Sequence, residues 1–361
     1  MDTVNANKRK EKWSGNPFKP YVTKNYIEGR GAVDMNGGTA AAICSLYILE
    51  KKDVPGGDIG EYSEDLLKDM IGIKSLSGRE GVMAQYLYEA LERAGMEVNR
   101  DNNGNVIGKM SLKHYNGNII FVGTVREEAA SDKDREKGLP YVLEHSLQEC
   151  DIELPTAAVM TEPTNMYAAI RHPGRVVAHI TFRGRKGGPC HTGDMKKGDN
   201  AAINSFPYLT KLAEAFDGII NINQISSDSK DENKVPSEVI YSIDKRFYRD
   251  LDEVVRTIEE LKVNGKQPTI DYIGRRKPFE GNPNSDIAKA FAFRMCDGSF
   301  LSMDYSTDAT YTDNNDPIIP SLVIGVGDPK LAHQQHERAI REDLRAAPVI
   351  YAQGFGNYFK N

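Results

Sequence analysis

The sequence has few cysteines, and their spacing excludes two classes of small cross-linked protein. Its four cysteines lie far apart and form no Cys-x-x-Cys pair. A zinc knuckle needs such a pair, and a disulfide framework needs a denser set of cysteines in a short chain. We therefore expect reduced and mostly buried thiols at Cys44, Cys150, Cys190 and Cys296.

Long hydrophobic runs are also absent. The longest apolar stretch, residues 40–49, reaches about half of the ~20 residues that a membrane-spanning helix requires, and Ser45 interrupts it. Residues 1–10 carry charges with no apolar core after them, so no secretory signal is recognised. We expect a cytoplasmic protein that has no membrane partner.

An excess of positive charge is missing as well. The 361 residues include 46 Lys and Arg against 52 Asp and Glu, a formal charge of −6, and the basic residues are scattered. Nucleic-acid binders collect phosphates with a basic field, so we expect no nucleic-acid partner. With 39% hydrophobic residues, the chain is long enough for two soluble domains that each bury a core.

The N-terminal half contains alternating helical and strand-like segments. Apolar residues at helical spacing predict helices, and β-rich runs between Asn/Gly turns predict short strands. We expect helices over residues 39–51, 63–71 and 80–94, and strands over 97–100, 106–110 and 119–122. This half of the chain is therefore α/β in character.

Residues 174–273 change to the order strand, helix, strand, strand, helix, strand. This βαββαβ order is typical of a ferredoxin-like sheet with two helices on one face, which can form a domain of about 100 residues. We expect it as an insertion, residues 171–277, in a discontinuous domain formed by residues 1–170 and 278–361. The apolar run 318–325 is expected to return as an interior strand of that domain's sheet.

Candidate metal ligands follow four of the apolar or β-rich runs. They are Asp34, the pair Glu127 and Glu128, Glu162, and His333. Imidazole and carboxylate groups that converge from several strand ends suit divalent ions, and one carboxylate can bridge two of them. Adjacent carboxylates repel unless a cation neutralises one, which leaves the other as a general base. A lone Glu-Glu pair is more often a solvated acidic turn, so the prediction rests on the four segments together.

These segments resemble a family of dinuclear zinc amidohydrolases. Residues 1–4, Met-Asp-Thr-Val, resemble its His-x-Asp-x-Val motif, and residues 29–38, Gly-Arg-Gly-Ala-Val-Asp-Met-Asn-Gly-Gly, resemble its bridging-aspartate signature. Further matches lie at residues 127–128, 162–164, 190–201, 242–246, 306–309 and 332–333. The family includes acetylornithine deacetylase, succinyl-diaminopimelate desuccinylase, aminoacylase and glutamate carboxypeptidase. The resemblance implies an α/β, zinc-peptidase-like catalytic domain with a mixed sheet flanked by helices, plus an inserted α+β lid and dimerisation domain.

The resemblance also implies two zinc ions, for which Co²⁺ or Mn²⁺ can substitute at such ligands. It places Asp34 between the two ions, Glu162 on the first, and Glu128 with His333 on the second. Glu127 is implied as the base that activates a water for attack on an amide. The implied activity is hydrolysis of a small N-acyl amino acid or a short peptide.

Three residues of the smaller domain also resemble functional residues of the family. His191 resembles a residue that reaches across a homodimer to stabilise the oxyanion. Arg246 and Asn200 resemble residues near the substrate carboxylate, which an arginine fork suits. For Arg246, a structural salt bridge to Asp244 or Asp250 is an equal alternative.

The sequence departs from the family in the order of its segments and in one ligand. The segment that resembles the family's first helices, residues 63–110, follows the bridging aspartate, and one strand, residues 118–123, stands where the family has two. Asp2 is implied to orient a ligand histidine that has no counterpart here, and a frayed terminal residue is the equal alternative for Asp2. The α-amine of Met1 and His114 are the alternative nitrogen donors. The alternative function is therefore a non-enzymatic or impaired homologue that binds one metal or ligand.

Overall fold

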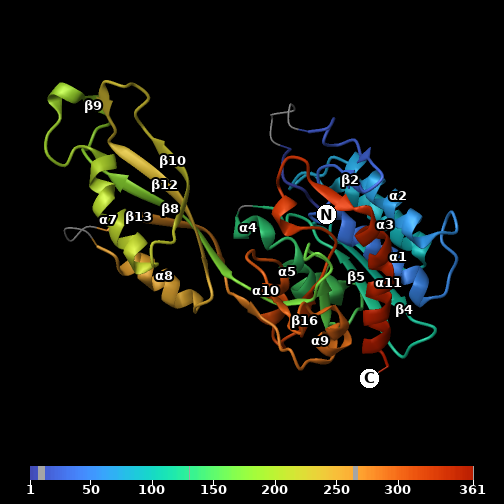
Figure 1. Ribbon diagram of the computed structural model, residues 1–361. Helices are drawn as coiled ribbons and strands as arrows, with labels where there is room; N and C mark the ends of the chain where they lie inside the picture. The colour runs from blue at the N-terminus through green and yellow to red at the C-terminus, as the bar shows by residue number, and fades with distance from the viewer. Residues whose placement is uncertain (7–12, 130, 263–266, 361) are drawn as a thin grey trace. The chain divides into compact units, whose positions relative to one another are not determined.

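Figure 1 shows the computed structural model, which describes residues 1–6, 13–129, 131–262 and 267–360. The chain divides into two compact units. The first contains Met1–Arg171 and Phe279–Asn361, and the second contains His172–Pro278. Among the helices of the described ranges, none combines the length and the apolar character that crossing a membrane requires.

Four long helices form much of the first unit. They are α1 (Asn36–Leu49), α2 (Ile59–Gly72), α3 (Gly81–Ala94) and α11 (Arg341–Tyr358). Helix α1 is buried along most of its length and packs against the other three. It begins at Asn36, earlier than the predicted residue 39, because Gly37 and Gly38 form part of its first turn. A Cβ at Gly38 would lie 2.2 Å from the carbonyl oxygen of Thr161, so glycine lets the start of α1 approach that backbone closely.

The strands of the first unit form three sheets. One is an antiparallel meander of β3 (Glu97–Arg100), β4 (Val106–Ser111) and β5 (Asn118–Gly123). A second has the order β14 (Phe279–Glu280), β7 (Ala169–His172), β16 (Ser321–Val323), β6 (Ala158–Met160), with β15 (Leu301–Ser302) beside β7. A third joins β1 (Tyr21–Val22), β2 (Tyr26–Glu28) and β17 (Arg338–Ile340). Since β16 runs parallel to β6 and antiparallel to β7, the predicted mixed α/β class is confirmed.

The apolar run 318–325 forms a shorter strand than predicted. Only Ser321–Val323 has ladder geometry, although the strand is fully buried. The carbonyl of Pro320 still accepts the N–H of Ala158 at 2.9 Å, but proline has no N–H to continue the ladder. At the other end, a Cβ at Gly325 would lie 2.2 Å from the Thr161 carbonyl oxygen. The backbone at Gly325 therefore passes so close to the backbone of Thr161 that it leaves no room for a side chain.

Short helices connect these sheets. They are α4 (Asp132–Arg135), α5 (Leu139–Tyr141), a π-helical turn (Val142–Ser146), α6 (Leu147–Glu149), α9 (Asp286–Ala290), α10 (Ala309–Asp313) and two 3₁₀ turns (Ala292–Arg294 and Pro329–Leu331). The π-helical turn packs its Val142 with Ile107 and Leu147 in a small core of its own. Ile120 and Val122 of β5 pack against this core.

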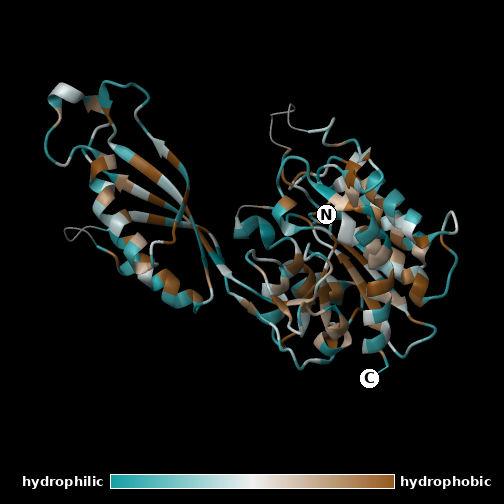
Figure 2. Ribbon diagram, in the orientation of Figure 1, coloured by the Kyte–Doolittle hydropathy of each residue, from teal (hydrophilic) through white to brown (hydrophobic). Residues whose placement is uncertain are grey.

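The second unit has a four-stranded antiparallel sheet and two helices. The sheet order is β10 (Asn221–Ser227), β12 (Glu238–Phe247), β8 (Gly174–Arg183) and β13 (Thr269–Arg276). Helices α7 (Ala201–Ala215) and α8 (Leu251–Glu260) are linked by a hydrogen bond of 2.8 Å from the Tyr208 hydroxyl to the Ile258 carbonyl. Figure 2 shows hydrophobic and hydrophilic residues alternating along α8, which matches a helix with one buried face. A two-stranded ribbon joins β9 (Cys190–His191) to β11 (Lys234–Val235).

The predicted βαββαβ order is present in this unit, with one shift. The mostly apolar residues Ile219 to Ile222 predict the third element of this order at residues 219–222, whereas β10 begins at Asn221. The amide of Ile219 instead bonds to the Phe216 carbonyl at 2.9 Å, so the turn after α7 extends further than the apolar residues suggest.

Candidate metal centre

Three predicted ligands from distant parts of the sequence meet in the first unit. The Nε2 atom of His333 lies 3.0 Å from Asp34 Oδ2 and 2.8 Å from Glu128 Oε1. Each of the three residues offers one ligand atom, and these atoms all lie within 4.8 Å of one another. Asp34 precedes α1, Glu128 follows β5, and His333 follows the Pro329–Leu331 turn. One imidazole and two carboxylates are a donor set that zinc and similar divalent ions accept.

The electrostatics of this cluster also fit a cation. Burial and the charge of Asp34 raise the pKa of Glu128 above its usual range. Hydrogen bonds to Asp34 and Glu128 raise the pKa of His333 to about 10. A divalent ion would relieve this repulsion between carboxylates and would displace the protons that the cluster otherwise holds.

Glu162 lies at the same cavity but outside the three-residue cluster. Its side chain is buried, and burial together with the charges of Asp34 and Glu127 raises its pKa well above the usual value. Glu162 lines a cavity of about 1150 Å³ in the first unit, as do Asp34, Glu127 and Glu128. Burial and repulsion by other carboxylates both disfavour the ionised form of Glu162, and a bound cation would offset both effects.

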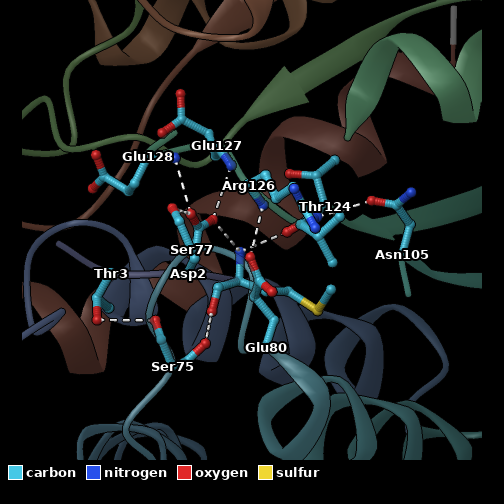
Figure 3. A network of polar contacts seen from close by, with 12 residues as sticks. Asp2, Thr3, Ser75, Ser77, Glu80, Asn105, Thr124, Arg126, Glu127 and Glu128 are labelled. Carbon is cyan, nitrogen blue, oxygen red and sulfur yellow. Dashed lines mark hydrogen bonds and ion pairs between the residues drawn. The ribbon is translucent and has the colours of Figure 1, made fainter. Parts of the chain in front are cut away.

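Asp2 fixes the position of the Glu-Glu pair (Figure 3). Its Oδ1 atom accepts the backbone N–H of Glu127 at 2.9 Å, and its Oδ2 atom accepts that of Glu128 at 3.0 Å. The hydroxyl of Ser77 also donates to Asp2 Oδ2. Asp2 therefore acts on the turn that carries both glutamates. Its predicted partner was a histidine side chain, so the structure gives this carboxylate a different set of contacts.

Two further side chains hold the chain just before the glutamates. Glu80 accepts the N–H of Arg126 at 3.1 Å, and Asn105 accepts the N–H of Val125 at 2.8 Å (Figure 3). These acceptors come from the start of α3 and from the β3–β4 turn. Two separate segments therefore hold the backbone just before Glu127 and Glu128. Neither Glu80 nor Asn105 was predicted to belong to the site.

Glu127, the predicted base, forms an ion pair that the sequence did not reveal. Arg135 Nη1 lies 2.6 Å from Glu127 Oε1 and 3.7 Å from Asp308 Oδ1. Arg135 is buried, and although burial lowers its pKa, the charges of Glu127 and Asp308 raise it overall. Arg135 therefore stays positive and holds the Glu127 carboxylate in one orientation. No motif at residues 131–137 points to this role.

Asp34 is held by a second buried ion pair. One oxygen of Glu337 accepts the N–H groups of Val33 and Asp34 at 2.9 and 3.0 Å. Its other oxygen accepts Arg30 Nη1 at 2.7 Å, and the Arg30 guanidinium lies over the Trp13 ring. The residues from Glu337 onward, Glu-Arg-Ala-Ile-Arg, are typical of a solvated helix start, but the Glu337 side chain is fully buried.

The other histidines and the amine near the site make local contacts. The half-exposed ring of His336 lies 3.2 Å from the Glu28 carboxylate. The α-amine of Met1 donates to the Thr124 carbonyl at 2.9 Å. His114 is exposed in the turn between β4 and β5.

The second unit carries the remaining predicted site residues. His191 is exposed on β9, and its Nδ1 accepts the N–H of Gly193 at 3.2 Å. Asn200 caps α7 by accepting the N–H groups of Ala202 and Ile203. Arg246 forms the salt bridge that was its structural alternative, with Nε 3.1 Å from Asp244 Oδ1. Cys190 is buried while His191 is exposed, as expected for adjacent residues of a strand, whose side chains point to opposite faces.

Sequence comparisons give matches to part of the chain. The sequence model of Peptidase family M20/M25/M40 matches residues 1–60. Succinyl-diaminopimelate desuccinylase from Helicobacter pylori is 26% identical over 122 residues, which are 31% of this chain and 30% of that protein. The aligned region thus spans less than a third of the length of this curated relative.

Structure comparisons cover far more of the chain. A tripeptidase from Staphylococcus aureus has a TM-score of 0.63 at 15% identity, covering 91% of this chain and 100% of that one. An M20 family metallo-carboxypeptidase from Sulfolobus solfataricus has a TM-score of 0.60 at 12% identity, covering 99% and 83%. At these identities the likeness shows a shared fold. With the match in residues 1–60, it confirms the predicted resemblance to the metallopeptidases and amidohydrolases of this family.

Proposed function

We propose that this protein is a metal-dependent hydrolase that cleaves the amide bond of a small N-acyl amino acid or a short peptide. The observation that carries the proposal is the convergence of Asp34, Glu128 and His333, with Glu127 and Glu162 on the same cavity. The desuccinylase and peptidase relatives support this substrate class. The acyl group and the amino acid stay open.

The proposed cofactor is a pair of zinc ions, with Co²⁺ or Mn²⁺ as substitutes. Asp34 would contact both ions, Glu162 would hold one, and Glu128 with His333 would hold the other. When bound, such ions polarise the scissile carbonyl and lower the pKa of a water. The buried carboxylates of this chain supply the negative charge that retains them.

Glu127 is the proposed general base. Its carboxylate takes a proton from the attacking water and passes it to the leaving amine. Arg135 fixes the carboxylate at 2.6 Å, and Asp2 fixes the backbone behind it at 2.9 Å. Two independent contacts thus limit the motion of the Glu127 carboxylate. A base held in one position can accept and return a proton over a short distance.

The second unit is proposed to supply substrate contacts and a homodimer surface. His191 is exposed and would stabilise the oxyanion from the partner subunit, while Asn200 and Arg246 would lie near the substrate carboxylate. Strand β10 pairs only with β12 among the described residues, and its Ile225 is 63% exposed. An open edge with exposed apolar side chains supports pairing with a second copy. Size-exclusion chromatography with light scattering, with Ile225→Lys as the interface variant, tests this proposal.

We also propose a cytoplasmic location. The four cysteines are free in the structure, although Cys44 and Cys190 are buried and Cys150 and Cys296 are half-buried. Free thiols are typical of a reducing compartment. Fractionation of cells that produce the full-length protein, followed by thiol titration, tests this location.

The decisive experiment measures turnover together with metal content. Metal-stripped protein is titrated with zinc and assayed on N-acetyl and N-succinyl amino acids and on dipeptides. Glu127→Gln should lower kcat by about 10²–10⁴-fold, as expected for loss of a general base, and should retain the metal seen by elemental analysis. The exposed Glu136→Gln is the matched control. Wild-type turnover in Glu127→Gln would show that another residue is the base.

The same titration separates the enzyme from the non-enzymatic alternative. Two metals per chain and a rate that rises with zinc support the dinuclear hydrolase. At most one metal, with no hydrolysis of any substrate in the screen, would support a homologue that only binds a metal or ligand.

A further inference from the structure

The large cavity of the first unit runs along two strand edges. Every residue from Asn118 to Thr124, and thus all of β5, lines it. On the other side, residues 151–162 line it without a gap, and these include all of β6. The carboxylates of the candidate metal centre occupy only one part of its wall.

Both edges lack a neighbouring strand among the described residues. Strand β5 pairs with β4 alone, and β6 pairs with β16 alone, so two sheets end at the same cavity. Unpaired N–H and C=O groups on a strand edge are a template for another strand. Two such edges on one cavity can bind the two sides of a single extended chain, because a strand in the middle of a sheet uses both of its edges.

The size and lining of the cavity match such an occupant. Its volume of about 1150 Å³ exceeds the roughly 300–1,000 Å³ of ordinary small-ligand pockets. The six residues of β5 would span about 20 Å. Apolar residues also line the cavity, among them Leu46, Leu87, Leu139, Val142 and Phe355. A strand that is buried on both faces has apolar side chains at successive positions, without the alternation of apolar and polar residues seen in half-buried strands. We therefore expect an occupant of this cavity to be apolar along its length.

Charge indicates which end of the occupant would be positive. Glu127 and Glu128 follow β5 directly, and Glu162 and Asp308 line the same cavity. In the metal-free chain, a basic side chain at the corresponding end of an extended segment would meet these carboxylates, whereas an acidic side chain would add to their repulsion. This complementarity belongs to the metal-free chain, because the ions proposed for the site would neutralise the same carboxylates.

We propose that the gap between β5 and β6 is a strand-docking slot that takes an extended apolar peptide segment with a basic residue at the carboxylate end. The occupant joins the sheet that ends at β5 and the sheet that ends at β6 into one. Main-chain hydrogen bonds to both edges supply most of the affinity, as in other proteins that recognise peptides by strand addition. The inference does not depend on hydrolysis, since neither metal nor substrate takes part.

The test uses a defined peptide on the full, metal-free chain. The probe is an acetylated and amidated peptide of about seven residues, with alternating valine and isoleucine between terminal lysines. Its binding is measured by calorimetry, and hydrogen–deuterium exchange locates it. We expect saturable binding and slower exchange at residues 118–123 and 158–160. The same peptide with N-methyl groups at alternate residues should not bind, because it lacks the donors for one edge.

Two variants separate the slot from the other open edge. Val159→Glu places a charge on β6 inside the cavity and should weaken binding by at least about tenfold. Ile225→Glu, on the exposed edge strand β10, should leave binding unchanged. Circular dichroism and a thermal transition check that both variants fold. If Val159→Glu is unfolded, the exchange pattern of the unmodified chain decides the question.

Three results would overturn the proposal. They are no binding at millimolar peptide, protection of β10 instead of β5 and β6, and equal affinity for the N-methylated peptide. Mass spectrometry of the recovered peptide shows whether it stays intact. Failure of peptide binding leaves the hydrolase proposal untouched, and failure of hydrolysis leaves the slot untouched.

Discussion

Arg30 and Glu337 form a buried ion pair of 2.7 Å, and the Glu337 oxygen outside this pair accepts the backbone N–H of Asp34. The pair thus joins the third sheet to the loop that carries a candidate metal ligand. Breaking a buried pair by removing one charge leaves the other uncompensated, at a cost of about 3–5 kcal/mol. The contact therefore bears on stability and on the position of Asp34 together.

Glu337→Gln tests this relationship. We expect the free energy of unfolding to fall by about 3 kcal/mol and zinc affinity to fall by about 10–100-fold, as for other residues that orient a ligand. Chemical denaturation and metal titration measure the two effects. The exposed Glu342→Gln serves as the control and should change stability by less than about 0.5 kcal/mol. A Glu337→Gln protein with unchanged zinc affinity would show that Asp34 does not need this support.

Asp2→Asn should disturb the Glu-Glu turn. The amide has one oxygen acceptor, so it can bond only one of the two N–H groups, and its NH₂ group would face the other. We expect kcat to fall by about 10–100-fold, with a smaller change in Ser77→Ala because that variant keeps both acceptors of Asp2. Steady-state kinetics on the substrate found in the screen measure both variants. Equal losses in the two variants would argue against the positioning role of Asp2.

Metal binding should release protons. The pKa of His333 is raised to about 10 by hydrogen bonds to Asp34 and Glu128, so its ring is protonated at pH 7 in the metal-free protein. A metal ligand must give up that proton. Calorimetric zinc titrations in PIPES and in HEPES, which bind zinc weakly and differ in ionisation enthalpy, should show release of at least about one proton per chain. His333→Ala should release fewer protons and bind more weakly, whereas identical heats in both buffers would contradict the assignment.

Acid should destabilise the second unit through His172. Burial lowers the pKa of this histidine to about 4, against an ordinary value of 6.5. The unfolded chain therefore binds the proton more readily in this range, so stability is constant above about pH 6.5 and falls as the pH drops towards 4. The full contribution is about 3 kcal/mol.

His172→Gln isolates that contribution. Its free energy of unfolding should depend less on pH than that of the natural sequence between pH 7 and 4.5, as measured by chemical denaturation. The exposed His145→Gln, in the first unit, is the control and should leave the pH profile unchanged. Parallel profiles for His172→Gln and the natural sequence would show that His172 is not the titrating group.

Local patterns in the sequence predicted most of the secondary structure. The periodicity of residues 80–94 and the β-rich runs near 97–122 correspond to α3, β3, β4 and β5. The motifs around Asp34, Glu128 and His333 identified three residues that the fold brings together. Helical and strand periodicities depend on near neighbours in the chain, and for this reason they can be recognised without the fold.

Contacts between distant segments were decided by the tertiary structure alone. Asp2 reaches Glu127 across 125 positions, and Glu337 reaches Val33 across 304. Nothing near Arg135 or Glu337 distinguishes these residues from ordinary surface charges until packing removes them from water. The division of the first unit into two sheets at one cavity likewise depends on which strands become neighbours. The sequence therefore determined the elements and the ligand types, while packing of those elements determined which charges are buried, paired and aimed at the site.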